Sequence, residues 1–217
     1  MTEEMSIREY IRRKPREDGF ETAMFIYQSA LDQMNSRIEV LNNELNHVYS
    51  YNPIEYVKSR LKTPESIMKK LRKQGHDVSI DDMVEYVNDI AGGRITCSFF
   101  SEIQFLAAML ARQDNLSVLS IKDYLGHPKE SGYKSYHMLL LVPVALTDAV
   151  VPTKVEVQIR TMAMDFWASL EHKIYYKYEG NAPDYFAREL RECASIISKL
   201  DAKMMSLNDA MKKMDGE

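Results

Sequence analysis

Hydrophobic and polar positions follow a helical spacing at both ends of the chain. Nine apolar residues recur at intervals of four and three over residues 20–48, and nine more do so over residues 186–214. This spacing places the apolar side chains on one stripe of a helix. It predicts a long N-terminal helix over residues 20–50 and a long C-terminal helix over residues 184–214. Such helices need a buried stripe, because intrinsic propensity alone does not stabilise them.

The middle of the chain has the pattern of an α/β domain. Thr63 is predicted to cap a helix that starts at Pro64 and stops at Gly75. Further helices are expected over residues 79–89, 101–112 and 162–178, and strands over residues 94–100, 116–122, 135–142 and 153–160. The polar residues 1–19 are predicted to form a loose arm ahead of a single domain over residues 20–217.

Composition narrows the class of protein. The chain has 217 residues, of which 45% are hydrophobic and 28% charged, as is usual for globular proteins. The longest apolar run, residues 138–146, contains a proline and is about half of what spans a bilayer. No basic segment followed by an apolar stretch opens the chain, and the two cysteines, Cys97 and Cys193, form no CxxC pair. A cytoplasmic protein without membrane or disulfide framework is expected.

Charge is distributed unevenly. The net charge is −4, yet residues 58–73 hold seven Lys or Arg and one acid. A basic island in an acidic chain favours one local anionic ligand over a long phosphate backbone, so no DNA partner is expected and RNA is not indicated. A solvated basic helix face is the alternative interpretation.

Three segments carry candidate chemistry. Glu156 and Gln158 alternate with apolar residues on a predicted strand, where they either line a polar cleft or face solvent. Asp89 and Arg94 flank Gly92-Gly93, which either admits a ligand or forms a simple turn. Residues 122–137 combine lysines, tyrosines and histidines in a loop, which offers charges to phosphates and a ring to a nucleobase, or is an aromatic-edged hairpin.

Together these segments indicate nucleotide phosphoryl chemistry. Mg²⁺ is usually held by one or two carboxylates plus substrate phosphates, and two acids on different elements fit that requirement. The chain has no Gly-x-x-x-x-Gly-Lys-Ser/Thr sequence, so a P-loop enzyme is excluded.

The same segments resemble the small alarmone synthetases, the single-domain Rel/Spo-type (p)ppGpp synthetases of bacteria. The matching stretches are PIEYVKSRLKTPESIMKKL, DIAGGR, KDYLGHPKESGYKSYH, VEVQIRT and MDFWASLEHKIYYKY, in family order over residues 53–178. Any one of them could arise by chance, whereas the whole series is specific. The resemblance implies a mixed β-sheet flanked by helices, a nucleotidyltransferase-like synthetase fold with long N- and C-terminal helices.

The resemblance also implies the reaction and the roles of residues. The family transfers the β,γ-pyrophosphate of ATP to the 3′-hydroxyl of GDP or GTP, giving (p)ppGpp and AMP in the stringent response, with Mg²⁺ as cofactor. Asp89 and Glu156 would hold the metal, and Glu156 would also act as the base. The ATP-binding residues would be Arg60 and Arg94, which sandwich adenine, and Lys62, Ser66 and Lys70, which hold phosphates. The guanosine nucleotide would contact Lys122, Lys129, Tyr133, Lys134, His137 and Gln158, with its base stacked on Tyr133.

Some positions depart from the family pattern. Gly93 replaces a larger apolar residue, Lys134 replaces the more common Arg, and Asp165 stands where some relatives have Asn, so allosteric nucleotide binding there is not carried over. The motifs do not distinguish GDP, GTP and GMP as acceptors. A tRNA 3′-end pyrophosphokinase and a non-catalytic nucleotide- or RNA-binding module are the alternatives. The two long stripes exceed what one α/β core covers, which favours a homo-oligomer, and relatives suggest a tetramer.

Overall fold

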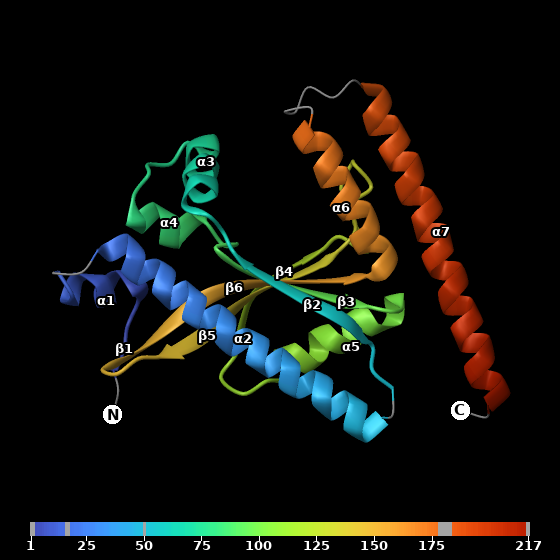
Figure 1. Cartoon of the computed structure of the whole chain (residues 1–217), viewed down its shortest axis with the longest axis horizontal. Coiled ribbons are helices and arrows are strands. Elements are labelled where there is room, and N and C mark those ends of the chain that lie inside the picture. Colours follow the sequence, from blue (N-terminus) through green and yellow to red (C-terminus); the bar gives the residue numbers. More distant parts are fainter. Residues whose placement is uncertain (1–2, 16–17, 50, 178–183, 216–217) are drawn as a thin grey trace.

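A computed structural model describes residues 3–15, 18–49, 51–177 and 184–215. The helices there are α1 (Ile7–Arg13), α2 (Gly19–Tyr49), α3 (Pro64–Gln74), α4 (Ile80–Tyr86), α5 (Phe100–Ala111), α6 (Met162–Lys177) and α7 (Asp184–Asp215). The strands there are β1 (Glu3–Glu4), β2 (Ile54–Leu61), β3 (Ala91–Cys97), β4 (Ser117–Asp123), β5 (Tyr136–Ala145) and β6 (Ala149–Thr161). The predicted fold class, a mixed sheet flanked by helices, is confirmed (Figure 1).

One mixed sheet organises the molecule, with strand order β2-β3-β6-β5-β4. The central strand β6 pairs in parallel with β3 and in antiparallel with β5, and β1 pairs with the start of β6. Val155, Val157 and Ile159 of β6 are completely buried in the main core, to which α2 and α5 contribute their apolar side chains. The intervening residues of β6 therefore point to the other face, which is where α6 stands (Figure 1).

Helix α2 follows its predicted stripe across the sheet. Tyr27, Met34 and Ile38 are almost completely buried, whereas Val48 in the last turn is exposed. The helix contacts β2, β3, β5 and β6, so it covers most of one face of the sheet. Residue 50, which the prediction included, lies outside the described residues.

Helix α3 has the predicted ends. The Thr63 side chain accepts a hydrogen bond from the Ser66 amide, and Gly75 takes the left-handed conformation, at φ 78°, that ends the helix. The basic island, however, is not one helix face. Residues 58–61 belong to β2, a strand that the apolar pattern did not predict because most of its side chains are exposed.

The glycine pair lies in a strand rather than in a turn. β3 begins at Ala91, three residues earlier than expected, and includes both Gly92 and Gly93. Gly92 pairs with Arg60 of β2 and Glu156 of β6, and neither glycine has a positive φ. Their role is therefore to leave space over the middle of the sheet, not to reverse the chain.

The prediction of a loose N-terminal arm is wrong for the described part of residues 1–19. β1 pairs with β6, and Met5 and Ile7 are buried in the main core. Ser6 and Glu9 form a capping box that starts α1. The segment is anchored by these two buried apolar side chains. Two such residues in an otherwise charged segment are too few to form a detectable periodic pattern.

The other predicted elements are found with shifted ends. The helix expected over residues 79–89 is α4 (Ile80–Tyr86), the one over 101–112 is α5, and the one over 162–178 is α6 up to Lys177. The strands expected over 116–122, 135–142 and 153–160 are β4, β5 and β6, and β5 and β6 are longer than expected. Residue 178 lies outside the described residues.

The apolar stripe of helix α7 is buried only in the first half of the helix. Leu190 and Ala194 pack with Trp167 and Ala168 of α6 in a second, smaller core, and Trp167 Nε1 donates a hydrogen bond to the Leu190 carbonyl at 3.0 Å. Beyond that contact the predicted stripe is exposed: Leu200, Met204, Leu207, Met211 and Met214. No helix of the described residues is both long and apolar enough to cross a membrane. Cys97 and Cys193 are free thiols.

Gly132 brings the loop before β5 close to α7. Its φ is +91°, and a Cβ atom placed there would lie 2.5 Å from Cβ of Ala194. We expect Gly132→Ala to lower the free energy of unfolding by about 1–3 kcal/mol, because backbone strain and a steric clash add up. Urea unfolding followed by circular dichroism measures the change. Gly126→Ala is the control: its Cβ would meet its nearest atom at 3.8 Å, and an equal loss there would contradict the argument.

Candidate active site

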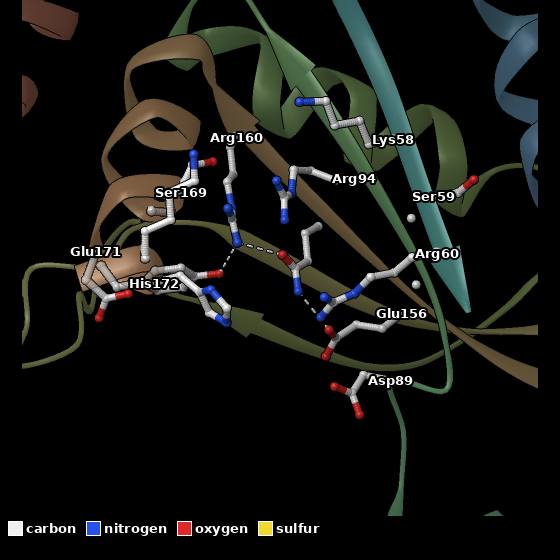
Figure 2. Close-up of a pocket in the computed structure, with 16 residues that line it drawn as sticks. Lys58, Ser59, Arg60, Asp89, Arg94, Glu156, Arg160, Ser169, Glu171 and His172 are labelled. Atoms are coloured by element: carbon white, nitrogen blue, oxygen red, sulfur yellow. Dashed lines mark hydrogen bonds between the residues drawn. The ribbon is translucent and has the colours of Figure 1, made fainter. Parts of the chain in front are cut away.

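A polar cavity of about 520 Å³ opens on the sheet face opposite α2, between β2, β3, β6 and α6. Figure 2 shows side chains from all four of these elements lining it. Of the residues predicted from the sequence, it brings together Arg60, Asp89, Arg94, Tyr133, Glu156 and Gln158. Segments nearly 100 residues apart in the chain therefore meet in one site.

Strand register explains why these side chains converge. Gly92 of β3 lies between Arg60 of β2 and Glu156 of β6, and Arg94 pairs with Gln158. Because side chains alternate along a strand, these residues share the face opposite the main core. The missing side chain at Gly92 leaves the floor open between a guanidinium and a carboxylate.

Asp89 precedes β3 and is held by two lysines. Lys62 Nζ and Lys70 Nζ each lie 2.7 Å from one of its carboxylate oxygens. Burial alone would raise the pKa of Asp89, but hydrogen bonds and charge from these two lysines outweigh it and hold the pKa below its ordinary value. Lys62 directly follows the end of β2, Lys70 lies on α3, and Asp89 precedes β3. Residues on or next to three elements therefore meet at this carboxylate.

The turn that carries Asp89 is tied to β6 by Lys154. Its ammonium donates to the carbonyls of Val84 and Glu85, at 3.1 and 2.8 Å, and to Oδ1 of Asn88 at 3.1 Å. These are the unpaired carbonyls at the end of α4, where a cation is favourable. Lys154 therefore fixes the turn next to Asp89 against the strand that carries Glu156.

Glu156 is the second acid of the cavity. Gln158 Nε2 donates to its Oε2 at 2.9 Å, and His137 Nδ1 lies 3.6 Å from its Oε1. Burial would raise its pKa, but hydrogen bonds from His137 and Gln158 outweigh burial and lower it, while the charge of Asp89 acts in the opposite direction. Glu156 is thus ionised at neutral pH, and both carboxylates open onto the same space (Figure 2).

Tyr133 also lines the cavity. Its hydroxyl lies 2.8 Å from His137 Nε2 and accepts a hydrogen bond from Arg160. Lys129 Nζ lies 4.7 Å from the centre of the ring. Burial raises the pKa of Tyr133, so its hydroxyl stays protonated. Lys129, from the loop before β5, and His137, from β5, therefore both lie beside Tyr133.

Seven predicted residues do not line the cavity within the described part of the chain. Four of them contact residues that do: Lys62 and Lys70 bind Asp89, and Lys129 and His137 contact Tyr133.

The other three are Ser66, Lys122 and Lys134. Ser66 is in the first turn of α3, where its hydroxyl bonds to Thr63. Lys122 on β4 pairs with His137 of β5, so the two side chains lie on the same side of the sheet. Lys134 lies near Asp201 of α7. Burial raises the pKa of Asp201, and the charge of Lys134 acts in the opposite direction. Their assigned roles stay predictions.

Some lining residues were not singled out from the sequence as site residues. Lys58 lies two residues before Arg60 on β2, and the period-two rule would have placed it on the same face. Glu171 and His172 line the cavity from α6, and burial raises the pKa of Glu171. Asp165 contacts both Arg94 and Arg160 at the start of α6. The helix itself was predicted, but the sequence offers no signal for which of its polar residues line the site, because helical spacing does not reveal which polar face of a helix meets a sheet.

The donor set suits Mg²⁺ bound together with a substrate. The described residues contain no group of three or more His, Cys, Asp or Glu side chains that would hold a metal ion alone. Two carboxylates in one cavity, flanked by Lys62 and Lys70, supply the oxygen ligands and phosphate-binding cations that such a site requires.

Comparison with known proteins identifies relatives of this chain. The family described as "Region found in RelA / SpoT proteins" matches residues 59–181. GTP pyrophosphokinase YwaC of Bacillus subtilis (strain 168) is 42% identical over 88% of this chain and 90% of its own. YjbM of the same strain, also named a GTP pyrophosphokinase, is 33% identical over 86% of this chain and 87% of its own.

Solved structures agree with these relatives. The crystal structure of small alarmone synthetase 2 from Bacillus subtilis matches with a TM-score of 0.82 and 41% identity, over 89% of this chain and 100% of that chain. Small alarmone synthetase 1 from the same organism, bound to its product pppGpp, matches with a TM-score of 0.84 and 32% identity, over 89% and 98%.

The lysine contacts of Asp89 predict a pH-dependent contribution to stability. A carboxyl whose pKa is lowered by folding stabilises the protein above its unfolded pKa, about 3.9, and loses that contribution as the pH falls through the folded value. In metal-free buffer at pH 7, Asp89→Asn should lower the free energy of unfolding by about 1–3 kcal/mol. The difference from wild type should shrink below pH 4.

Urea unfolding at pH 7, 5 and 3.5 tests this, with Asp209→Asn as the control. Asp209 is an exposed acid on α7, where a substitution should change stability by less than about 0.5 kcal/mol. A deficit of Asp89→Asn that stayed constant down to pH 3.5 would show that the carboxylate charge is not its source.

Proposed function

The chain belongs to the RelA/SpoT family, and from that premise we infer that it is a GTP pyrophosphokinase that synthesises (p)ppGpp from ATP. In this reaction the 3′-hydroxyl oxygen of GDP or GTP bonds to the β-phosphorus of ATP. The bond from that phosphorus to the α,β-bridging oxygen breaks, and AMP leaves. The observation that carries the assignment of the site is the meeting of Asp89 and Glu156 in one cavity, between a basic and an aromatic end.

The ATP subsite is assigned to the β2–β3 side of the cavity. Arg60 and Arg94 are diagonal neighbours across these two strands, and Cα atoms in such positions lie about 7–8 Å apart. This spacing would admit one planar ring between the two guanidinium groups. Lys62 and Lys70 beside Asp89 are placed to bind phosphates, and Ser66 adds the first turn of α3, where free amides favour anions.

The guanosine nucleotide is assigned to the end of the cavity near Tyr133. The guanine base would stack on the Tyr133 ring. Lys129 lies over this ring in the structure and would move aside to make room for the base. His137 and Gln158 lie beside Glu156 and would contact the sugar or phosphates. Lys122 and Lys134 are the further cations proposed for the phosphates of this nucleotide.

Glu156 is proposed as the base. Its lowered pKa keeps it ionised, so it can accept a hydrogen bond from the 3′-hydroxyl and then its proton as the oxygen bonds to phosphorus. Asp89 and the two lysines hold the pyrophosphate in line with that oxygen. Bound by Asp89 and Glu156 and the phosphates, Mg²⁺ would supply charge neutralisation for the phosphoryl group.

Product analysis tests the reaction and the two acids together. Purified protein with ATP, GDP and Mg²⁺ should give AMP and ppGpp. Asp89→Asn and Glu156→Gln should each lower kcat by about 10²–10⁴-fold, because a positioned acid or base contributes on that scale. Thin-layer chromatography of labelled nucleotides measures both products. Glu130→Gln, in the exposed loop, is the control and should retain activity.

Several outcomes would redirect the assignment. Wild-type rates in both acid variants would remove the site proposal. Product on tRNA but not on GDP, GTP or GMP would favour a tRNA 3′-end pyrophosphokinase. Nucleotide binding that EDTA does not change, without release of AMP, would favour a non-catalytic binding module.

We also propose that the protein is a homo-oligomer, with a tetramer expected from the family. The support is the exposed apolar face of α7, on which Leu200, Leu207 and Met211 are 54%, 50% and 64% exposed. A second copy would remove this face from water. Complete burial of a fully exposed side chain contributes about 1.5–3 kcal/mol, and each of these half-exposed side chains would contribute roughly half of that to the assembly.

Charge on this face should disrupt the assembly. Leu207→Glu is expected to shift the protein to a smaller species at micromolar concentration, as measured by size-exclusion chromatography with light scattering. Lys213→Gln changes the net charge by the same amount on the other side of α7 and should leave the mass unchanged. A monomeric wild type, or an assembly that Leu207→Glu does not alter, would contradict the proposed interface.

A further inference from the structure

A buried carboxylate at the start of α6 is not used by the proposed chemistry. Asp165 has 4% of its side chain exposed and lies behind the wall of the cavity. Its Oδ1 accepts hydrogen bonds from Arg94 Nη1 at 2.9 Å and from Arg160 Nη1 at 3.2 Å. Its Oδ2 accepts a hydrogen bond from the Tyr56 hydroxyl at 2.9 Å. One carboxylate oxygen is thus shared by guanidinium groups from two different strands.

The first guanidinium leads to the ATP subsite. Arg94 lies on β3, lines the cavity and is one of the two proposed adenine-stacking residues. Arginine has many rotamers, and a planar stacking group is effective only when its plane is fixed. The bond to Asp165 fixes one end of this guanidinium from behind.

The second guanidinium leads to the guanosine subsite. Arg160, on β6, is 5% exposed and donates to the Tyr133 hydroxyl and to Gln158 Oε1, the latter at 2.6 Å. With its oxygen occupied in this way, Gln158 turns its amide nitrogen to Glu156 at 2.9 Å. Arg160 therefore orients the stacking ring and holds Gln158, which is also proposed to contact the guanosine nucleotide.

A negative charge is required at position 165 for electrostatic reasons. Arg94 and Arg160 are both cationic, and in the described part of the chain Asp165 is the ion-pair partner of the buried Arg160. The carboxylate lies in the first turn of α6, where the helix dipole favours an anion. An amide would keep the shape and one acceptor but lose the charge.

We propose that Asp165 is a positioning residue that orders both nucleotide subsites through this single carboxylate. The inference rests on the proposed function for the identity of the two subsites. Because Asp165 acts through Arg94 and Arg160 and touches neither nucleotide, its loss weakens the binding of both nucleotides while the reacting groups remain in place.

Binding and kinetics of Asp165→Asn test the proposal. A non-hydrolysable ATP analogue and GDP, titrated separately by calorimetry, should each bind about tenfold or more weakly, the scale of one charge-assisted hydrogen bond. KM for both substrates should rise by a similar factor, with kcat at saturation changed by less than about threefold. Asp165→Glu retains the charge but displaces it, and provides the same comparison if Asp165→Asn does not fold.

Tyr56→Phe is the matched control, because it removes a contact to the same carboxylate that does not lead to the cavity. It should leave both dissociation constants within about twofold of wild type. Weaker binding of only one nucleotide would overturn the shared role. A lower kcat with unchanged KM, in proportion to the folded fraction, would reduce Asp165 to a structural residue and also overturn it.

The binding measurements separate this inference from the assignment of function. A wild type that binds both nucleotides but releases no AMP would refute the pyrophosphokinase activity, and the effect of Asp165→Asn on binding would still decide the positioning role. A wild type that binds neither nucleotide would overturn both.

Discussion

β3 and β6 run in parallel with Gly92 opposite Glu156 and Arg94 opposite Gln158, and the rest of the site depends on that pairing. A shift of one residue would turn Glu156 into the main core and Val157 into the cavity, because side chains alternate between the faces of a strand. The register is fixed by the complete burial of Val155, Val157 and Ile159 on the other face. Hydrophobic packing on one side of the sheet thus determines where the acids lie on the other.

Two acids on the polar face of the sheet are stabilised by cationic partners. Asp89 is paired with two lysines and Asp165 with two arginines, so opposite charges alternate along the cavity. A carboxylate removed from water without such partners would become protonated or destabilise the fold. The same cations are those that a nucleotide substrate requires, so the pairs that stabilise the empty cavity also prepare it for phosphates and bases.

Much of this arrangement could be predicted from the sequence, and the failures have physical causes. The long helices, the ends of α3 and β6 followed from periodicity and capping, which are local properties. β2 was missed because an edge strand with exposed charged side chains lacks the apolar alternation that marks a strand. Asp89 and Glu156 were recognised as candidates, but their meeting depends on sheet register, which no local pattern contains. Asp165 acts only through partners on two other strands, and therefore its contacts could not be anticipated.

The guanosine end of the cavity is connected to α7, the helix with the exposed apolar face. Tyr133 packs against the small core formed by Trp167, Ala168, Leu190 and Ala194, and Gly132 next to it approaches Ala194. The loop that carries Tyr133 therefore rests on the first half of α7, and the second half of this helix carries the exposed apolar face. Because α7 is one continuous helix, Asp184–Asp215, the proposed assembly face and the contact with the Tyr133 loop lie on the same element. A residue without a side chain is needed where the loop meets the helix, because Gly132 has a φ of +91° and a Cβ atom there would lie 2.5 Å from Cβ of Ala194.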